Sequence, residues 1–309
     1  MVEGFFFLAP VFSQSQDLQL RDRSMSSYDY HTLMISADYY SNTNVMGMFN
    51  STTRQPSYSP AATFFSKWGV DFSAMGYFLD NSDDSLENFT SELDLWIGYN
   101  FRPAENLTIY PSYTHYFYSD NSNSLKSLFS DDFQLDIDYQ YRFINFGASA
   151  GYFLGKQDVF YAALHNYYQI DINRFLFRNV SLTILPGWDA NFGSYEYLNQ
   201  YYLDELREEP YFYAYLLSFP DIRRYVYLEL RSNPDLTYKD VMNNYLDEQA
   251  QDNFKLTSLG INLPVYVLWG NFGMNLGLYA LIPFGQPDYL LDDTQFFINI
   301  GLTYNLMFR

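Results

Sequence analysis

The sequence predicts an all-β fold: a transmembrane, up-and-down antiparallel β-barrel of about twelve strands, with a helical insertion in one outer loop. Three observations support this prediction. Apolar and polar residues alternate in many stretches, the connections between these stretches sort into short and long ones, and aromatic residues are abundant. The 309-residue chain has 32 tyrosines and 29 phenylalanines, and aromatic residues make up 21% of it.

The C-terminal stretch FFINIGLTYNLMFR shows the alternation most clearly. Every second residue from Phe296 to Phe308 is apolar, while residues between them, such as Asn299 and Thr303, are small or polar. A period of two indicates a β-strand with one apolar face and one polar face. The same pattern recurs in WGVDFSAMGYF, ELDLWIGYNF and FQLDIDYQYRF. Stretches of about ten residues are long enough to cross a bilayer at the tilt of barrel strands.

Counting all such stretches predicts strands near 30–41, 58–66, 68–79, 91–101, 106–118, 132–143, 145–154, 158–172, 179–192, 255–268, 271–283 and 295–308. An even number of strands brings both ends of the chain to the same side of the barrel. Links after odd-numbered strands are mostly long and rich in Asp, Asn and Ser, whereas links after even-numbered strands are short. Bacterial membrane barrels show this asymmetry, with short periplasmic turns and long outer loops.

The aromatic residues at strand ends fit the girdles that membrane barrels place at the two interfaces: Trp68, Tyr77, Phe101, Tyr118, Phe143, Trp188 and Trp269. A large β-sandwich is the alternative, but its strands are usually shorter and its core needs fewer aromatic residues. Pro111, Pro186 and Pro264 fall inside predicted strands. Because a closed barrel has no free edge to accommodate them, we expect bulges or positions near a rim there.

Composition excludes several other classes of protein. Without cysteine the chain has no disulfide, thiolate nucleophile or cysteine zinc site. A net charge of −19 opposes binding to nucleic acid, and to anionic surfaces unless divalent cations bridge the contact. Residues 1–16 look like the apolar core and cleavage region of a signal peptide without its basic start. A buried N-terminal strand is the alternative, and residues 17–309 form the predicted barrel domain.

The alternating strands, the aromatic-ended last strand and the loops rich in Tyr, Asn and Asp resemble outer-membrane β-barrels of the Bacteroidota type, porin-like or transporter-like, over essentially the whole chain. The resemblance implies a Gram-negative source, an outer-membrane location with both termini periplasmic, and contact with the lipid bilayer and lipopolysaccharide. It also implies that the barrel-insertion machinery recognises the C-terminal strand. The chain departs from the pattern at Arg309, which follows the terminal aromatic residue Phe308.

If the polar strand faces point inward, the lumen is acidic. The lumen-lining residues expected on this basis are Asp38, Asp71, Glu92, Asp94, Asp136, Asp138, Arg142, His165 and Asp189. Carboxylates in a narrow channel repel anions and concentrate cations, so the pattern favours a cation-leaning channel or transporter for small solutes. The alternative is that these residues only solvate the barrel interior. Inward glycines at Gly273, Gly277 and Gly301 would keep part of the wall thin.

Residues 193–253 interrupt the alternation. PDIRRYVYLELRS (220–232) and LTYKDVMNNYLDEQ (236–249) have apolar residues at helical spacing, and YLNQYYLDEL (197–206) is similar. Thr237 and Asp240 form a capping pair in the second of these. The strand count puts this insertion in an outer loop, as a cap over the rim, a lid inside the lumen or a docking surface for a partner protein. In the last case the barrel would be a structural or accessory part of a cell-surface or secretion assembly.

Catalytic, metal and cofactor sites are not indicated. The three histidines are His31, His115 and His165, and no zinc-ligand spacing, phosphate-binding glycine loop or nucleotide motif is present. The segment YTHYFYSDNS around His115 resembles the outer-membrane phospholipase pattern. However, Phe117 stands where that family has its nucleophilic serine. We therefore expect no enzyme activity and no cofactor.

Overall fold

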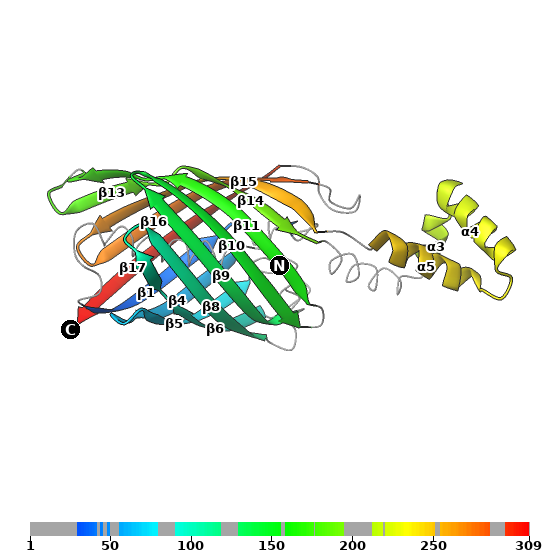
Figure 1. Cartoon of the computed structure of the whole chain (residues 1–309), viewed down its shortest axis with the longest axis horizontal. Helices are drawn as coiled ribbons and strands as arrows, with labels where there is room; N and C mark the ends of the chain where they lie inside the picture. Colours follow the sequence, from blue (N-terminus) through cyan, green and yellow to red (C-terminus); the bar gives the residue numbers. More distant parts are fainter. Residues whose placement is uncertain are drawn as a thin grey trace. The chain divides into compact units, whose positions relative to one another are not determined.

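The computed structural model describes residues 30–41, 44–45, 48–49, 56–79, 90–118, 129–155, 158–175, 177–194, 212–218, 220–250, 254–284 and 294–308. A closed barrel of twelve antiparallel strands accounts for most of them (Figure 1). The barrel fold and the strand positions expected from the alternation are confirmed. The expected signal-peptide segment, residues 1–16, lies outside the described residues.

The barrel strands follow one another around the wall in chain order: β1 (His31–Tyr40), β4 (Ser57–Phe65), β5 (Val70–Leu79), β6 (Thr90–Tyr99), β8 (Leu107–Tyr118), β9 (Phe129–Tyr141), β10 (Ile144–Gly155), β11 (Val159–Tyr168), β14 (Gly187–Gly193), β15 (Lys255–Trp269), β16 (Phe272–Pro283) and β17 (Gln295–Phe308). Shorter strands extend three of them: β7 (Phe101–Ala104), β12 (Ile170–Asn173) and β13 (Val180–Ile184). The strands β2 (Asn44–Val45) and β3 (Met48–Phe49) form a separate hairpin.

The first and last strands close the barrel. β1 and β17 pair antiparallel from His31 opposite Phe308 to Tyr40 opposite Asn299. The His31 ring stacks on Phe308 at 5.9 Å and on Phe64 at 5.5 Å, which fixes the start of the seam. Both ends of the described barrel therefore lie at the same rim as the turns at 66–69, 105–106, 142–143, 174–179 and 270–271. We call this end the short-turn rim and the opposite end the long-link rim.

Side chains alternate between the two faces of the wall as expected. In β4 the exposed and buried residues alternate along the strand, and the outward residues Leu93, Leu95, Leu135 and Ile137 are about 40% exposed or more. Bulk apolar residues thus cover the exterior, whereas polar ones point inside. Each of the twelve described barrel strands pairs with a neighbour on both sides. A closed wall with an apolar exterior suits a barrel whose outer face contacts lipid.

Two of the expected girdle residues face the other way. Tyr77 is only 1% exposed, because it shares the inner face of β5 with Asp71 and Ser73. Tyr118 stacks with inward Tyr116 at 6.2 Å. The remaining expected girdle residues are exposed: Trp68, Phe101, Phe143, Trp188 and Trp269.

The three prolines are accommodated differently. Pro186 lies between β13 and β14 and interrupts what would otherwise be one strand. Pro111 and Pro264 lie within β8 and β15 opposite Leu135 and Gly277, where the pairing with β9 and β16 is regular. On its other side each proline lies at an interruption: β8 pairs with β6 as far as Ser112 and with β7 from Ile109, and Pro264 accepts the Leu185 N–H at the break between β13 and β14.

The insertion forms a separate packed unit, Ser194–Lys255. Its described helices are α3 (Phe212–Leu216), α4 (Pro220–Ser232) and α5 (Tyr238–Ala250), so the two helices expected at 220–232 and 236–249 are confirmed. Val226 on α4 packs against Val241 and Met242 on α5 in the centre of this unit. The helical pattern at 197–206 lies outside the described residues. None of the described helices is long and apolar enough to cross a membrane.

The expected capping pair closes the start of α5. The Thr237 backbone N–H donates to Asp240 Oδ2 at 2.8 Å, and the Asp240 N–H donates to Thr237 Oγ at 3.2 Å. Hydrogen bonds from the Thr237 side chain and backbone lower the pKa of the Asp240 carboxyl. Because the folded carboxyl ionises at lower pH than an unfolded one, its stabilisation of α5 is complete above the unfolded pKa. That stabilisation is lost as the pH falls through the lowered pKa.

Replacing Thr237 with alanine is expected to speed amide exchange in the first turn of α5 by about fivefold, because losing an N-cap costs about 1 kcal/mol. Hydrogen-exchange mass spectrometry of the intact protein measures this directly. Ser232→Ala is the control, since the Ser232 hydroxyl donates only to Leu228 in α4. Equal exchange of the first turn of α5 in the two variants would show that the capping pair does not stabilise the helix.

Candidate functional site

The inner wall of the barrel carries a series of carboxylates. The expected ones lie on inward positions of their strands: Asp38, Asp71, Glu92, Asp94, Asp136, Asp138 and Asp189. Asp94 is fully buried, and Asp136 is only 3% exposed. Sequence reasoning missed Asp132, which lies on the same face of β9. The alternation could have identified it, because it is two positions from Gln134 and four from Asp136.

Arg142 does not line the lumen. The sequence pattern extends the strand to Phe143, but β9 ends at Tyr141 and the chain turns at Arg142, whose φ is +57°. The side chain is exposed, with its guanidinium carbon 5.4 Å from the centre of the Tyr141 ring. The base expected to offset the inward carboxylates therefore lies at the short-turn rim.

His165 lies in a row of inward groups near the middle of the wall. In the register of β9, β10, β11 and β14, the row runs Asp138, Gly147, His165 and Asp189. His165 Nε2 is 2.9 Å from Asp138 Oδ1, and both side chains are about nine-tenths buried. Among the described residues, no lysine or arginine lies on the inner wall between the two rims. His165 therefore lies between two acidic residues, Asp138 and Asp189, and it contacts the Asp138 carboxyl group directly.

Amides hold the next carboxylate in the row. Asn262 Nδ2 donates to Asp189 Oδ1 at 2.9 Å, and Asn191 Nδ2 donates to Asp189 Oδ2 at 3.0 Å. A similar pair lies across the seam, where Asn275 Nδ2 donates to Asn299 Oδ1 at 2.9 Å and lies 3.4 Å from Asp38 Oδ1. These amides hold the carboxyl groups by hydrogen bonds from neutral donors.

Glycines on adjacent strands make room for the inward groups. A Cβ on Gly147 would overlap His165 Nε2 and the Asp138 carboxylate, and a Cβ on Gly301 would overlap Asp38. The space in front of Gly277 is likewise filled by the Tyr279 ring. The glycines expected to thin the wall therefore have a different role. They let polar and aromatic side chains lie sideways against it.

Tyrosine hydroxyls extend the polar wall toward both rims. Tyr110 donates to Asp71 Oδ2 at 2.9 Å. Tyr161 lies 3.3 Å from both Asp132 oxygens and 3.2 Å from Gln134 Oε1. Each of these contacts joins two strands that are neighbours or next neighbours in the sheet. The register between the strands therefore determines which tyrosine meets which acid, and the sequence alone does not show it.

Two aromatic clusters lie on the inner wall toward the long-link rim. Phe129 stacks on Phe153 at 4.7 Å, and Phe153 stacks on Tyr161 at 4.9 Å. Tyr279 stacks on Phe297 at 4.8 Å with the rings nearly parallel. The first cluster belongs to β9–β11 and the second to β16 and β17, and β14 and β15 lie between them in the strand order. Bulky rings therefore occupy two separate parts of the inner wall.

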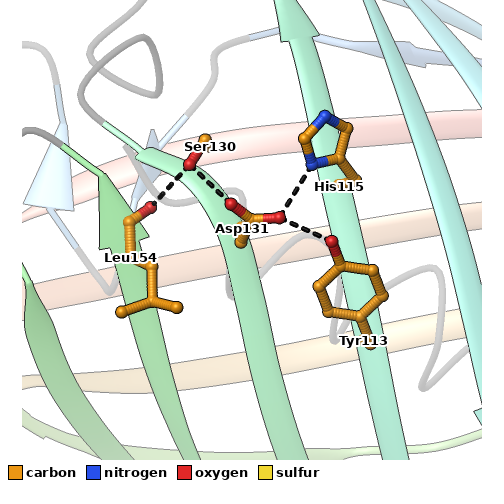
Figure 2. A network of polar contacts seen from close by, with 5 residues as sticks. All are labelled: Tyr113, His115, Ser130, Asp131 and Leu154. Carbon is orange, nitrogen blue, oxygen red and sulfur yellow. Dashed lines mark hydrogen bonds and ion pairs between the residues drawn. The ribbon is translucent and has the colours of Figure 1, made fainter.

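A polar network lies on the outer face near the long-link rim (Figure 2). Asp131 Oδ1 accepts the Tyr113 hydroxyl at 2.5 Å and lies 2.7 Å from His115 Nδ1. Ser130 donates to Asp131 Oδ2 at 2.6 Å and is 3.4 Å from the Leu154 carbonyl oxygen. A register shift opposite Leu154 lets the two consecutive residues of β9 join one network.

This network does not have the arrangement of a nucleophile activated by a base. The Ser130 hydroxyl and the His115 ring bind different oxygens of Asp131, so the carboxylate lies between them. Phe117 packs edge-on against the His115 ring at 4.5 Å. An activated serine would instead donate to the histidine. Among the described residues, no three His, Asp or Glu side chains are placed to hold a metal ion.

The sequence matches no protein-family profile and no curated protein. Several solved structures are similar to the chain. The KdgM porin has a TM-score of 0.45 and 6% identity, with 88% of this chain and 98% of that chain covered. The COG4313 outer-membrane channel from Pseudomonas putida F1 has a TM-score of 0.43 and 9% identity, with 90% and 96% covered. The NanC porin has a TM-score of 0.42 and 9% identity, with 89% and 100% covered.

Proposed function

We propose that this protein is an outer-membrane channel for small solutes with a cation-leaning lumen. The observation that carries the proposal is the inner wall itself, where carboxylates held by neutral amides and tyrosines face a barrel interior with no described lysine or arginine between the rims. Carboxylates lining a channel attract cations and repel anions. The two aromatic clusters on the inner wall favour a narrow passage for single small solutes.

The proposal includes the remaining expectations drawn from the sequence. The barrel lies in the outer membrane of a Gram-negative bacterium of the Bacteroidota, exported with a signal peptide, with lipopolysaccharide around the long-link rim. We expect both termini to face the periplasm, since the two ends of the described barrel, His31 and Phe308, share a rim with the short turns. The insertion machinery recognises β17. The protein is not an enzyme and binds no cofactor or nucleic acid.

Single-channel recording in a planar bilayer tests the proposal. We expect a stable current that carries more cations than anions, measured as the reversal potential across a salt gradient. The double variant Asp138→Asn, Asp189→Asn should move this potential toward zero, because it removes two inward charges while keeping amide-sized side chains. Asp131→Asn is the matched control, since it removes a charge from the outer face. A silent protein, or an equal shift in control and variant, would contradict the proposal.

A second candidate function is a structural barrel of a surface or secretion assembly that binds a partner protein through 193–253. One observation favours it. The insertion packs its own core, and α4 still presents an exposed face with Tyr227 and Leu228, 65% and 49% exposed, beside Arg223, Arg224 and Arg231. A solvated cap has no need of exposed apolar side chains, whereas a docking helix does.

Replacing residues 196–250 with a short Gly/Ser linker is expected to leave a folded, inserted barrel. β14 and β15 are neighbours in the sheet, so the linker spans a short distance, and the insertion is a separate packed unit. Detergent-resistant electrophoretic mobility and circular dichroism measure folding. For a cap or lid we expect conductance to rise, whereas for a docking surface conductance is unchanged and a co-purifying partner is lost. A barrel that fails to assemble would show that the insertion is integral to the fold.

A further inference from the structure

Most of the inward carboxylates described above are buried, but two of them keep part of their surface exposed. These two are Asp38 on β1 and Asp189 on β14. A solute inside the barrel therefore reaches these two carboxyl groups more directly than the buried ones. Asp38 has the more unusual surroundings, because a polar atom close to it has no hydrogen-bond donor among the described residues.

Asp38 shares a small space with an asparagine from two strands away. Gly301 on β17 lies opposite Asp38 on one side and opposite Asn275 of β16 on the other. A Cβ on Gly301 would overlap both Asp38 Oδ1 and Asn275 Oδ1. The lack of a side chain on Gly301 therefore lets these two oxygens face the same point on the inner wall.

Neither of these oxygens brings a hydrogen to the shared space. Asn275 Nδ2 donates to Asn299 Oδ1 at 2.9 Å and lies 3.4 Å from Asp38 Oδ1. The buried Asn275 Oδ1 has no hydrogen-bond partner in the part of the chain that the structure describes. A buried acceptor without a donor is destabilising, and more so beside a carboxylate. Because the described inner wall supplies no lysine or arginine here, a cationic donor from outside the chain complements both oxygens.

Aromatic rings lie next to these oxygens on the side of the long-link rim. Tyr40 is two residues beyond Asp38 on the inner face of β1. It packs in one cluster with Phe297 and Leu281, and Tyr279 stacks on Phe297 at 4.8 Å. A solute that enters from the long-link rim therefore meets an aromatic surface before it reaches Asp38.

We propose that Asp38 and Asn275 bind the ammonium group of a small organic amine inside the barrel. A protonated primary amine has three N–H donors, enough to satisfy the Asp38 carboxylate and the Asn275 amide oxygen together. Its apolar part lies against Tyr279 and Phe297, whose ring faces also attract a cation. An alkali ion fits between the two oxygens but leaves the rings without a role. This binding rests on the proposed function, because the amine has to enter the channel to reach Asp38.

Isothermal titration calorimetry of the protein in non-ionic detergent micelles tests the proposal, with the heats of empty micelles subtracted. The probe is n-butylammonium chloride, and n-butanol is the uncharged comparison with the same hydrocarbon chain. We expect saturable binding of n-butylammonium and none of n-butanol. Sodium chloride at the same concentration as the amine should not displace it.

Two variants should weaken the binding of n-butylammonium. Asp38→Asn should lower the affinity about tenfold or more, as expected when a hydrogen bond to a charged group is lost. Gly301→Ala should have a similar effect, because its methyl group occupies the space that the two oxygens share. Asp189→Asn is the matched comparison, since it removes the other partly exposed inward carboxylate. It should lower the affinity at most about twofold, because a charge outside the site acts only through screened attraction.

A native protein that binds no n-butylammonium, binds n-butanol equally well or exchanges the amine for sodium would overturn the proposal. Asp38 and Asn275 would then be satisfied by a proton on the carboxyl group or by a reversed amide. Equal weakening in Asp38→Asn and Asp189→Asn would overturn it as well. If the variants do not fold, the measurements on the native protein decide. A cation-selective current without amine binding would contradict this proposal alone, whereas amine binding by a protein that is silent in bilayers would contradict only the channel.

Discussion

Replacing Leu135 with arginine is expected to destabilise the inserted barrel by about 2–4 kcal/mol, because a cation is placed at the lipid-facing middle of the wall. Leu135 lies near the centre of β9, points outward and is 41% exposed. No acid is available to an outward side chain there, since its neighbours across the sheet are Pro111 and Ala150. Unfolding by urea in lipid vesicles, followed by tryptophan fluorescence and electrophoretic mobility, measures the loss.

The adjacent residue provides a matched control. Gln134→Arg introduces the same side chain on the opposite face, where Gln134 Nε2 already donates to Asp136 and Tyr161 lies close by. We expect a change well below that of Leu135→Arg, because the new cation meets carboxylates. Asp136→Asn should likewise leave insertion nearly intact. Equal damage from the outward and inward substitutions would mean that the faces of β9 have been assigned the wrong way round.

Replacing Gly147 with valine is expected to cost about 1–3 kcal/mol, the usual price of overpacking. The new side chain would occupy the space in which His165 Nε2 meets the Asp138 carboxylate. Either the histidine or the strand has to move, so the contact between them breaks. Urea unfolding measures the stability, and the nitrogen chemical shifts of the His165 ring report the lost contact.

Gly76→Val is the control for this substitution. Gly76 lies on the outer face of β5, and an added Cβ there would make only ordinary contacts, the nearest at 3.6 Å to Phe78. A valine at that position adds apolar surface on the lipid side and should be neutral or slightly stabilising. If Gly147→Val is as harmless as Gly76→Val, glycine at 147 is not needed to seat the His165–Asp138 pair.

The strands were predictable from sequence because the alternation of apolar and polar residues within each strand is enough to identify it. The alternation in FQLDIDYQYRF assigns both faces of β9 without reference to any other part of the chain. The end of that strand was not predictable. Arg142 continues the polar pattern, but the tight turn places it at the rim with a positive φ. The alternation of apolar and polar residues does not show that the chain turns at this position.

Contacts between strands were the part of the site that sequence could not supply. Asn275 approaches Asp38 across the seam between the first and last strands of the described barrel, and Asn262 on β15 approaches Asp189 on the neighbouring strand β14, which the insertion separates from β15 in sequence. Both depend on register, which follows from the whole closed sheet. The role of the glycines was hidden for the same reason. Gly301 looks like a gap in its own strand, and only the position of Asp38 on the neighbouring strand explains why a gap is needed there.

The seam between β1 and β17 also determines how slowly this barrel can form. Its pairs join the two ends of the described barrel, so closure is the most non-local step of folding. The loop entropy of bringing these ends together has to be overcome before any of the seam contacts, including the His31 and Phe308 stack, can contribute. Until the seam forms, β1 and β17 are edge strands, each with one row of unpaired backbone N–H and C=O groups. A second incompletely folded chain has the same two edge strands and can pair with them. Assembly is therefore a kinetic competition between closing one barrel and joining two chains, and it favours closure when unfinished chains are kept dilute.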